Sequence, residues 1–359
     1  MDYSLTSLTI SLDNMSLFDE LSKFTDLEEL DCSNNALTNL SLDYLPFLKT
    51  LKCSNNKLTQ LETNCYLQKL YCNNNHLTSL SLSCLHDFYL LDFCCLIILN
   101  CSNNQLTQLT ITALQELQEL YCDNNQLPEL DFTQNLCLQI LFCNGNKMGK
   151  INVAHNHHLA VFECSDNQLT ELNVTTNIYL KSLNCADNQL SALDVTHNGD
   201  LHTLLCGNNL LTKLDLTYLH FLVELNCTNN HLTHLDLTHV PNLHYLYCND
   251  NQLTQLTLYN LPNLQIVHCY NNQLINLILI DLPNLQDLNC SCNKLRQVDL
   301  IHLTSLVRLY CDDNNLRELQ ITDEQLENLK VIILDDLIEL TPTQTNIIGR
   351  IQSARARDQ

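Results

Sequence analysis

The sequence predicts an α/β-class repeat solenoid, in which short parallel strands stack into a sheet. A cysteine followed three residues later by an asparagine occurs fourteen times. Eleven of these cysteines follow one another at intervals of 21 residues. A fixed period of this length is the signature of a solenoid, whose stacked units share one continuous core. The fourteen ladder cysteines are Cys32, Cys53, Cys72, Cys101, Cys122, Cys143, Cys164, Cys185, Cys206, Cys227, Cys248, Cys269, Cys290 and Cys311.

One complete unit, residues 222–237, shows how each repeat is built. It reads LVELNCTNNHLTHLDL. Leu225 and Cys227 alternate with other residues, so this stretch is predicted to be a short strand with both side chains inward. The leucine-rich repeats that this unit resembles place Asn230 where the chain turns off the sheet, and its amide can satisfy backbone groups that would otherwise be buried unpaired. The same structural ladder is expected to include Cys122, Asn125, Cys206 and Asn209.

The unit L-x-x-L-x-C-x-x-N-x-L-x-x-L-x-L resembles the leucine-rich repeat, with cysteine in place of one leucine. The resemblance covers about residues 5–340. It implies a right-handed superhelix with short parallel strands on a concave face and irregular or 3₁₀ segments on a convex face. It also implies that the outward-pointing strand residues carry ligand recognition.

Departures from the repeat divide the chain into three parts. Residues 1–26 are expected to form an N-terminal cap or half-repeat, and residues 27–321 the solenoid. Residues 322–359 are expected to form C-terminal capping helices and a tail, because Thr322 and Gln325 have the spacing of a capping box.

One insertion interrupts the solenoid near residues 84–95, where the interval between ladder cysteines lengthens to 29 residues. The insertion is strongly apolar. Two interpretations remain open: a decayed repeat that folds back on the core, or an exposed apolar patch used for contact.

Net charge and the length of apolar stretches indicate which classes of partner and which cellular compartment to expect. The formal net charge of −23 disfavours binding to nucleic acid and to anionic membranes. The longest apolar stretch, which includes residues 94–99, is far shorter than the ~20 residues needed to span a bilayer. Residues 1–4 begin no signal peptide. We therefore expect a soluble cytoplasmic protein, and we favour a monomer.

The twenty cysteines indicate a reducing compartment rather than disulfides. Most of them occupy one inward, leucine-flanked position, where a thiol packs as a small apolar group. Six cysteines lie off the ladder and are expected to be exposed and oxidisable. These are Cys65, Cys84, Cys94, Cys95, Cys137 and Cys292.

No catalytic, cofactor or metal site is predicted. The chain contains no phosphate-binding, nucleophile-elbow or metalloprotease motif, and only five glycines. The densest histidine run, His155, His157 and His158, lacks carboxylates or thiols at ligand spacing. The ladder thiols point inward among leucines, which is the opposite of an activated thiolate site. We expect no enzymatic activity, no cofactor and no metal.

The candidate partner-binding residues are strand residues that point outward beside the ladder cysteines, on the expected concave face. Many are tyrosines, which are enriched at interface hot spots, although cross-strand aromatic pairs can also simply stabilise a sheet. Acidic residues surround them and predict a protein partner with a basic surface. The candidates are Tyr245, Tyr247, His268, Tyr270, Tyr310, Tyr121, Phe142, Ile140, Glu163 and Asp287.

The repeat unit, often followed by L-x-x-L-P-x-L, is similar to stand-alone repeat proteins of bacteria, in particular effectors that intracellular bacteria deliver into host cells. This resemblance implies an interaction protein translocated into the host cytosol without a Sec signal peptide. The acidic residues between Asp323 and Glu339 resemble a glutamate-rich signal for type IV secretion, although they would equally cap a solenoid. The alternative is an endogenous cytosolic scaffold or regulatory subunit, for example one that positions a phosphatase.

Overall fold

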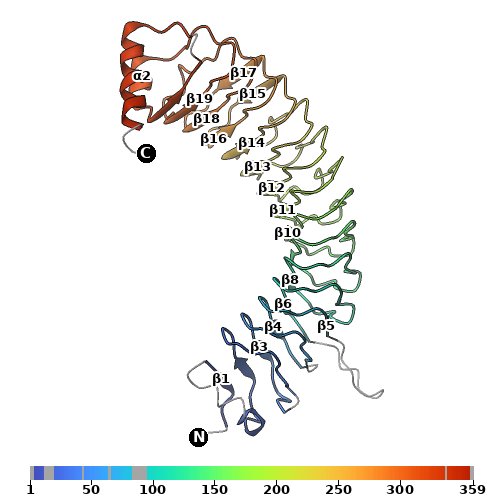
Figure 1. Cartoon of the computed structure of the whole chain (residues 1–359). Helices are drawn as coiled ribbons and strands as arrows, with labels where there is room; N and C mark the ends of the chain where they lie inside the picture. Colours follow the sequence, from blue (N-terminus) through green and yellow to red (C-terminus); the bar gives the residue numbers. More distant parts are fainter. Residues whose placement is uncertain are drawn as a thin grey trace. The chain divides into compact units, whose positions relative to one another are not determined.

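The protein is a parallel β-solenoid with one main strand per repeat (Figure 1). Its contacts divide the chain into two compact units, Met1–Leu180 and Lys181–Gln359. The computed structural model describes residues 4–11, 20–42, 44–63, 66–82, 95–335 and 338–355.

In the first unit, neighbouring strands of the main sheet are parallel and aligned repeat by repeat. Leu120 lies opposite Leu141, for example, and the central residue of each of these strands is buried. Two further strands, β5 (Leu80–Ser81) and β7 (Leu109–Thr110), pair in a small second sheet. The main-sheet strands are, in order, β1 (Ser7–Thr9), β2 (Glu29–Asp31), β3 (Thr50–Lys52), β4 (Lys69–Tyr71), β6 (Ile98–Asn100), β8 (Glu119–Tyr121), β9 (Ile140–Phe142) and β10 (Val161–Glu163).

The expected insertion near residues 84–95 leaves the main sheet intact. Strand β4 pairs directly with β6, and Leu70 lies opposite Leu99. The insertion itself lies outside the described residues except for Cys95, which is exposed. The extra length therefore does not shift the register of the following repeats.

The second unit continues the same pattern and ends in two helices. A second sheet forms from β15 (Gln255–Tyr259) and β17 (Asn276–Ile280). The main-sheet strands are β11 (Ser182–Asn184), β12 (Thr203–Leu205), β13 (Glu224–Asn226), β14 (Tyr245–Tyr247), β16 (Ile266–His268), β18 (Asp287–Asn289), β19 (Arg308–Tyr310) and β20 (Val331–Ile333). The helices are α1 (Asp323–Asn328) and α2 (Pro342–Arg355).

The helical C-terminal cap predicted from the sequence is present. The hydroxyl of Thr322 accepts a hydrogen bond from the backbone N–H of Gln325, and the Gln325 side chain accepts one from the backbone N–H of Thr322. This capping box starts α1 and turns Leu326 inward, where it is fully buried. Helix α2 packs against α1 and β20 at the end of the sheet (Figure 1).

The return segments between strands differ from the expectation in part. They are mostly turns rather than 3₁₀ helices, and four of them contain the short strands of the second sheets. Extended segments of neighbouring repeats can pair there because the repeats are in register.

All fourteen ladder cysteines are buried with no exposed surface. The cysteines that the structure describes are reduced thiols. Burial raises the pKa of Cys206 to about 12, so its thiol stays protonated and acts as an apolar filler. Of the off-ladder cysteines, Cys95 is exposed, Cys137 and Cys292 are half-buried, and Cys65, Cys84 and Cys94 lie outside the described residues.

The ladder asparagine lies at the turn after each strand and connects successive repeats. The Asn230 amide nitrogen donates to the carbonyl oxygens of Cys206, Cys227 and Thr228 at 3.1, 3.1 and 3.2 Å. Its amide oxygen accepts the backbone N–H of Leu211 at 2.9 Å. One buried side chain therefore satisfies backbone groups of two neighbouring repeats.

The residue before each ladder asparagine has a left-handed backbone conformation. Asparagine and aspartate tolerate positive φ better than other residues, and glycine has no penalty there. Cys292, with φ of 53°, is the exception in the series. The residues at this position are Asn34, Asn55, Asn74, Asn103, Asn124, Gly145, Asp166, Asp187, Asn208, Asn229, Asp250, Asn271, Cys292 and Asp313.

The ladder amide can be tested at Asn230. Asn230→Ala should lower the free energy of unfolding by roughly 1–3 kcal/mol, because it leaves buried backbone groups without partners. Asn230→Asp should destabilise at least as much, since it keeps the acceptor for Leu211 but turns an oxygen toward three carbonyl oxygens. Urea denaturation followed by circular dichroism measures both changes.

The control for this test is Asn103→Asp at the equivalent exposed turn position of another repeat, where the side-chain oxygen accepts a hydrogen bond from Asn124 and aspartate keeps that acceptor. It should change the stability by less than about 0.5 kcal/mol. An Asn230→Asp protein as stable as the unmodified chain would contradict the role given to the amide nitrogen.

The left-handed turn gives a second prediction. Cys292→Asn should raise the free energy of unfolding by about 0.5–1 kcal/mol, because asparagine suits the positive φ that cysteine does not. Cys292→Ser removes the same thiol without this preference and should give no comparable gain. Equal stabilities of the two variants in thermal denaturation would argue against backbone strain at this turn.

Candidate functional site on the outward face of the sheet

The first and third residues of each main strand point away from the core and form two rows on the sheet. In β14 and β16 the central residue is buried while its neighbours are half-buried. Residues 21 positions apart thus become neighbours on adjacent strands, about 4.8 Å apart. We call this surface the sheet face.

In the second unit, aromatic residues cluster on the sheet face. Tyr247 lies opposite His268, and their rings meet edge to face with centroids 5.3 Å apart. Tyr270 lies two residues after His268, just beyond the end of β16, with its ring centroid 6.3 Å from that of His268. Tyr245 lies in the neighbouring row, opposite Ile266. We call these residues, with Tyr310, the Tyr247 patch.

Tyr310 lies at the far side of this patch. It is opposite Asn289, which is in turn opposite His268. Two strand spacings therefore separate Tyr310 from His268, as expected from the sequence. The structure places the rings of Tyr247 and Tyr270 each in contact with His268, and it places Tyr310 on the same face without a ring contact to these three residues.

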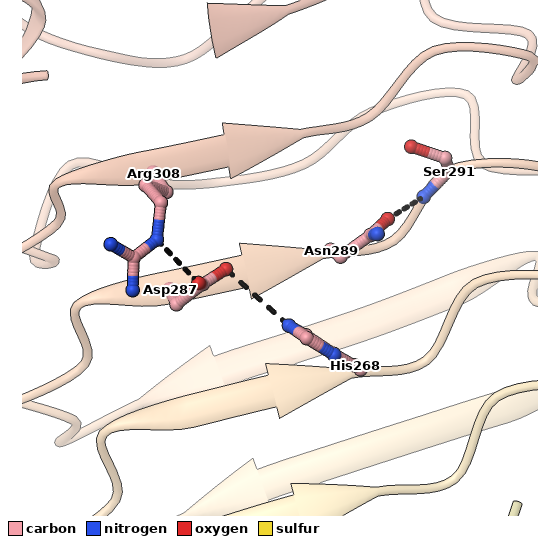
Figure 2. A network of polar contacts seen from close by, with 5 residues as sticks. All are labelled: His268, Asp287, Asn289, Ser291 and Arg308. Carbon is pink, nitrogen blue, oxygen red and sulfur yellow. Dashed lines mark hydrogen bonds and ion pairs between the residues drawn. The ribbon is translucent and has the colours of Figure 1, made fainter. Parts of the chain in front are cut away.

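Asp287 does not present an open carboxylate, which differs from its expected place among the acidic contact residues. Its side chain is only 9% exposed, and one oxygen accepts a hydrogen bond from Arg308 Nε at 2.6 Å. The other oxygen lies 3.5 Å from His268 Nε2 (Figure 2). Asp287 is covered because two larger side chains on adjacent strands converge on it.

Burial acts to raise the pKa of Asp287, but the contacts with His268 and Arg308 outweigh it and hold the pKa below its usual value. The carboxyl group is therefore charged at neutral pH and internally compensated. It positions its neighbours and is not available to a partner's basic side chain.

Arg308 belongs to the site, although the sequence reasoning did not select it. It lies opposite Asp287 in the parallel register, and its side chain is 45% exposed. The sequence does contain a pattern that points to Arg308. It lies 21 residues after Asp287, and residues one repeat apart become cross-strand neighbours, where opposite charges can pair.

A second cluster, the Tyr121 patch, lies on the sheet face of the first unit. Tyr121 and Phe142 are opposite each other, and their ring centroids are 5.1 Å apart. Ile140 lies beside Phe142 on β9, and Glu163 lies opposite Phe142 on β10. All four are half-buried, so the strand register brings the predicted group together.

Carboxylates surround the Tyr121 patch. The Tyr121 hydroxyl donates to Glu119 at 2.9 Å. Partial burial and this hydrogen bond raise the pKa of Tyr121 to about 12. Asp123 accepts the backbone N–H of Asn144 at 2.8 Å, and its partial burial raises its pKa. The patch combines an apolar centre with negative charge.

Within the described residues, no three histidine, cysteine or acidic side chains gather closely enough to hold a metal ion. No helix in the described part of the chain is long and apolar enough to cross a bilayer.

Comparison with known proteins supports the repeat assignment. A sequence profile described as Leucine Rich repeats (2 copies) matches residues 25–65. No curated protein gave a significant match. The functional domain of InlJ from Listeria monocytogenes, which includes a cysteine ladder, is a similar solved structure with 30% identity and a TM-score of 0.80. That match covers 91% of this chain and 71% of the other.

Two further bacterial structures are similar over most of their length. A leucine-rich repeat protein of Leptospira interrogans is 26% identical, with a TM-score of 0.69, covering 98% of this chain and 89% of its own. YopM, a leucine-rich effector protein from Yersinia pestis, is 26% identical with a TM-score of 0.71, covering 90% and 88%.

The Asp287 network makes stability depend on pH. A carboxyl group whose folded pKa lies below its unfolded value stabilises the folded state above the ordinary pKa of ~3.9, and this is lost as pH falls through the folded pKa. Asp287→Asn should therefore be less stable than the unmodified chain at pH 6. The difference should shrink below about pH 4. A difference that stays constant between pH 6 and 3 in urea denaturation would contradict this assignment.

Proposed function

Because the chain belongs to the leucine-rich repeat family, we propose that it is a non-enzymatic module that binds a protein partner on its sheet face. The family fold is in general an interaction scaffold. The observation that carries the proposal is the Tyr247 patch, where half-buried aromatic side chains from neighbouring strands share one face. Tyrosine anchors of this kind supply large contact areas at little cost in side-chain entropy.

We further propose that the partner is a host protein and that the chain acts as a bacterial effector in the host cytosol. The support is similarity to bacterial repeat proteins, including the effector YopM at 26% identity. The fully buried, protonated ladder thiols suit a reducing compartment such as that cytosol. Delivery by type IV secretion is part of this proposal.

The partner surface that fits best is basic. The chain has a net charge of −23, which would steer a basic partner toward it. Glu119 and Asp123 lie beside the Tyr121 patch, and Glu163 lies across from Phe142. These carboxylates can pair with lysine or arginine at the rim of an interface.

The experiment is capture of partners from a host-cell lysate on the immobilised full chain, identified by mass spectrometry. A specific host protein should bind the unmodified chain. It should be lost from a variant carrying both Tyr247→Ala and Tyr270→Ala, because truncating interface anchors typically costs 2 kcal/mol or more, roughly a thirtyfold loss of affinity.

A matched control removes the same number of tyrosines at positions away from the sheet face. Tyr218 and Tyr259 are 62% and 60% exposed in the same unit but lie off the main sheet. The Tyr218→Ala, Tyr259→Ala variant should still capture the protein. Loss with this control, or retention in the sheet-face variant, would place binding elsewhere; capture of only the producing organism's own proteins would favour the endogenous scaffold.

A further inference from the structure

Arg308 places an exposed positive charge beside the Tyr247 patch. Lysine and arginine side chains of a basic partner cannot pair with this charge. Arg308 is the first residue of β19, and its Nε donates to Asp287 on β18 (Figure 2). The Arg308 side chain is 45% exposed, whereas that of Asp287 is 9% exposed. A partner that approaches the sheet face therefore meets the cation of this pair before the anion.

The guanidinium has unused donors. It carries five N–H groups, and the contact with Asp287 occupies only the one on Nε. In the described part of the chain, the terminal nitrogens of Arg308 make no hydrogen bond or ion pair. Their planar fork matches the two oxygens of a carboxylate. Because Asp287 already holds the side chain, a second carboxylate would lose little affinity to ordering it.

Two other acidic residues of the second unit, Asp312 and Glu224, are separated from Arg308 along the backbone. Asp312 is four residues beyond Arg308, a backbone spacing of about 13 Å at ~3.3 Å per residue, and its carboxylate accepts a hydrogen bond from the Ser291 hydroxyl at 2.6 Å. Glu224 is four strands away in the sheet, a backbone spacing of about 19 Å at ~4.8 Å per strand. Both backbone spacings are longer than the Debye length of ~8 Å at physiological ionic strength, so salt weakens the effect of these carboxylates on Arg308.

Aromatic groups lie beside the cation on the same face. Tyr310 is two residues after Arg308 on β19 and is half-buried. On the other side of Asp287, His268 is held between that carboxylate and the ring of Tyr247. The site thus offers one cationic fork next to aromatic surfaces, which suits a carboxylate flanked by apolar side chains.

We propose that the Tyr247 patch binds a peptide segment of the partner whose aspartate or glutamate pairs with the terminal nitrogens of Arg308. This inference rests on the proposed function, in which the sheet face binds a protein. The partner surface, otherwise basic, must then present one aspartate or glutamate to Arg308. The neighbouring apolar side chains of the segment pack on Tyr247 and Tyr310.

The test selects linear peptides from a random heptapeptide display library on the immobilised full chain. Three proteins are compared: the unmodified chain, Asp287→Asn, and Asp287→Asn combined with Arg308→Gln. The double variant removes both charges together, so no buried carboxylate is left alone and the net charge is preserved. The single variant keeps the arginine and frees it from its internal partner.

Peptides selected by the unmodified chain should carry aspartate or glutamate at one shared position. Asp287→Asn should bind a selected peptide at least as tightly as the unmodified chain, because the asparagine oxygen can still accept the Arg308 Nε–H while the competing negative charge is gone. The double variant should bind it about tenfold to a hundredfold more weakly, as expected for loss of a charged hydrogen-bonded pair. It should also show no acidic preference in its own selection.

Other outcomes separate the two proposals. Peptides that need Tyr247 and Tyr270 but prefer lysine or arginine, or an acidic preference that persists in the double variant, would overturn the role of Arg308 and leave the binding function standing. Peptides bound equally by the Tyr247→Ala, Tyr270→Ala variant, or no enrichment at all, would overturn binding at this patch and the acidic contact with it.

Discussion

The buried ladder asparagine is the interaction on which the rest of the structure depends. The amide of Asn56 donates to the carbonyl oxygens of Cys32 and Cys53, one in the preceding repeat and one in its own. The amide oxygen accepts the N–H of Leu37. Unsatisfied backbone groups are costly inside a protein, so each turn is stable only when the next repeat stacks in register. The same constraint lets β4 and β6 pair across the long interval between Cys72 and Cys101.

A fixed register separates the scaffold from the surface. Inward positions repeat leucine and cysteine because the core must be filled at close-packed density. Outward positions are free of that demand, and from β6 to β19 each one is a neighbour of the residues 21 positions away on the adjacent main-sheet strands. Substitution within a single repeat can therefore build a local cluster without disturbing the fold. The tyrosines and His268 of the Tyr247 patch, and Tyr121 with Phe142, are clusters of this kind.

Net charge does not describe the sheet face in detail. The chain is strongly acidic, and the Tyr121 patch follows that balance with Glu119 and Asp123 nearby. At the Tyr247 patch the sign reverses locally, because Asp287 is covered and Arg308 stands over it. Salt screens distant charges, so a partner senses the nearest exposed group more than the total. Recognition by the two patches is consequently expected to differ in the charge each one favours.

The sequence by itself determined the strands, the inward cysteines, the turn asparagines and the capping box at Thr322, because each depends on a short local pattern or on the repeat period. It also placed Tyr247, His268 and Tyr270 on one face. Only the tertiary structure decided that Asp287 is buried beneath Arg308. The period sets which residues are neighbours. Which of two neighbouring side chains covers the other depends on their lengths and on packing across strands. The repeat spacing does not specify either of these.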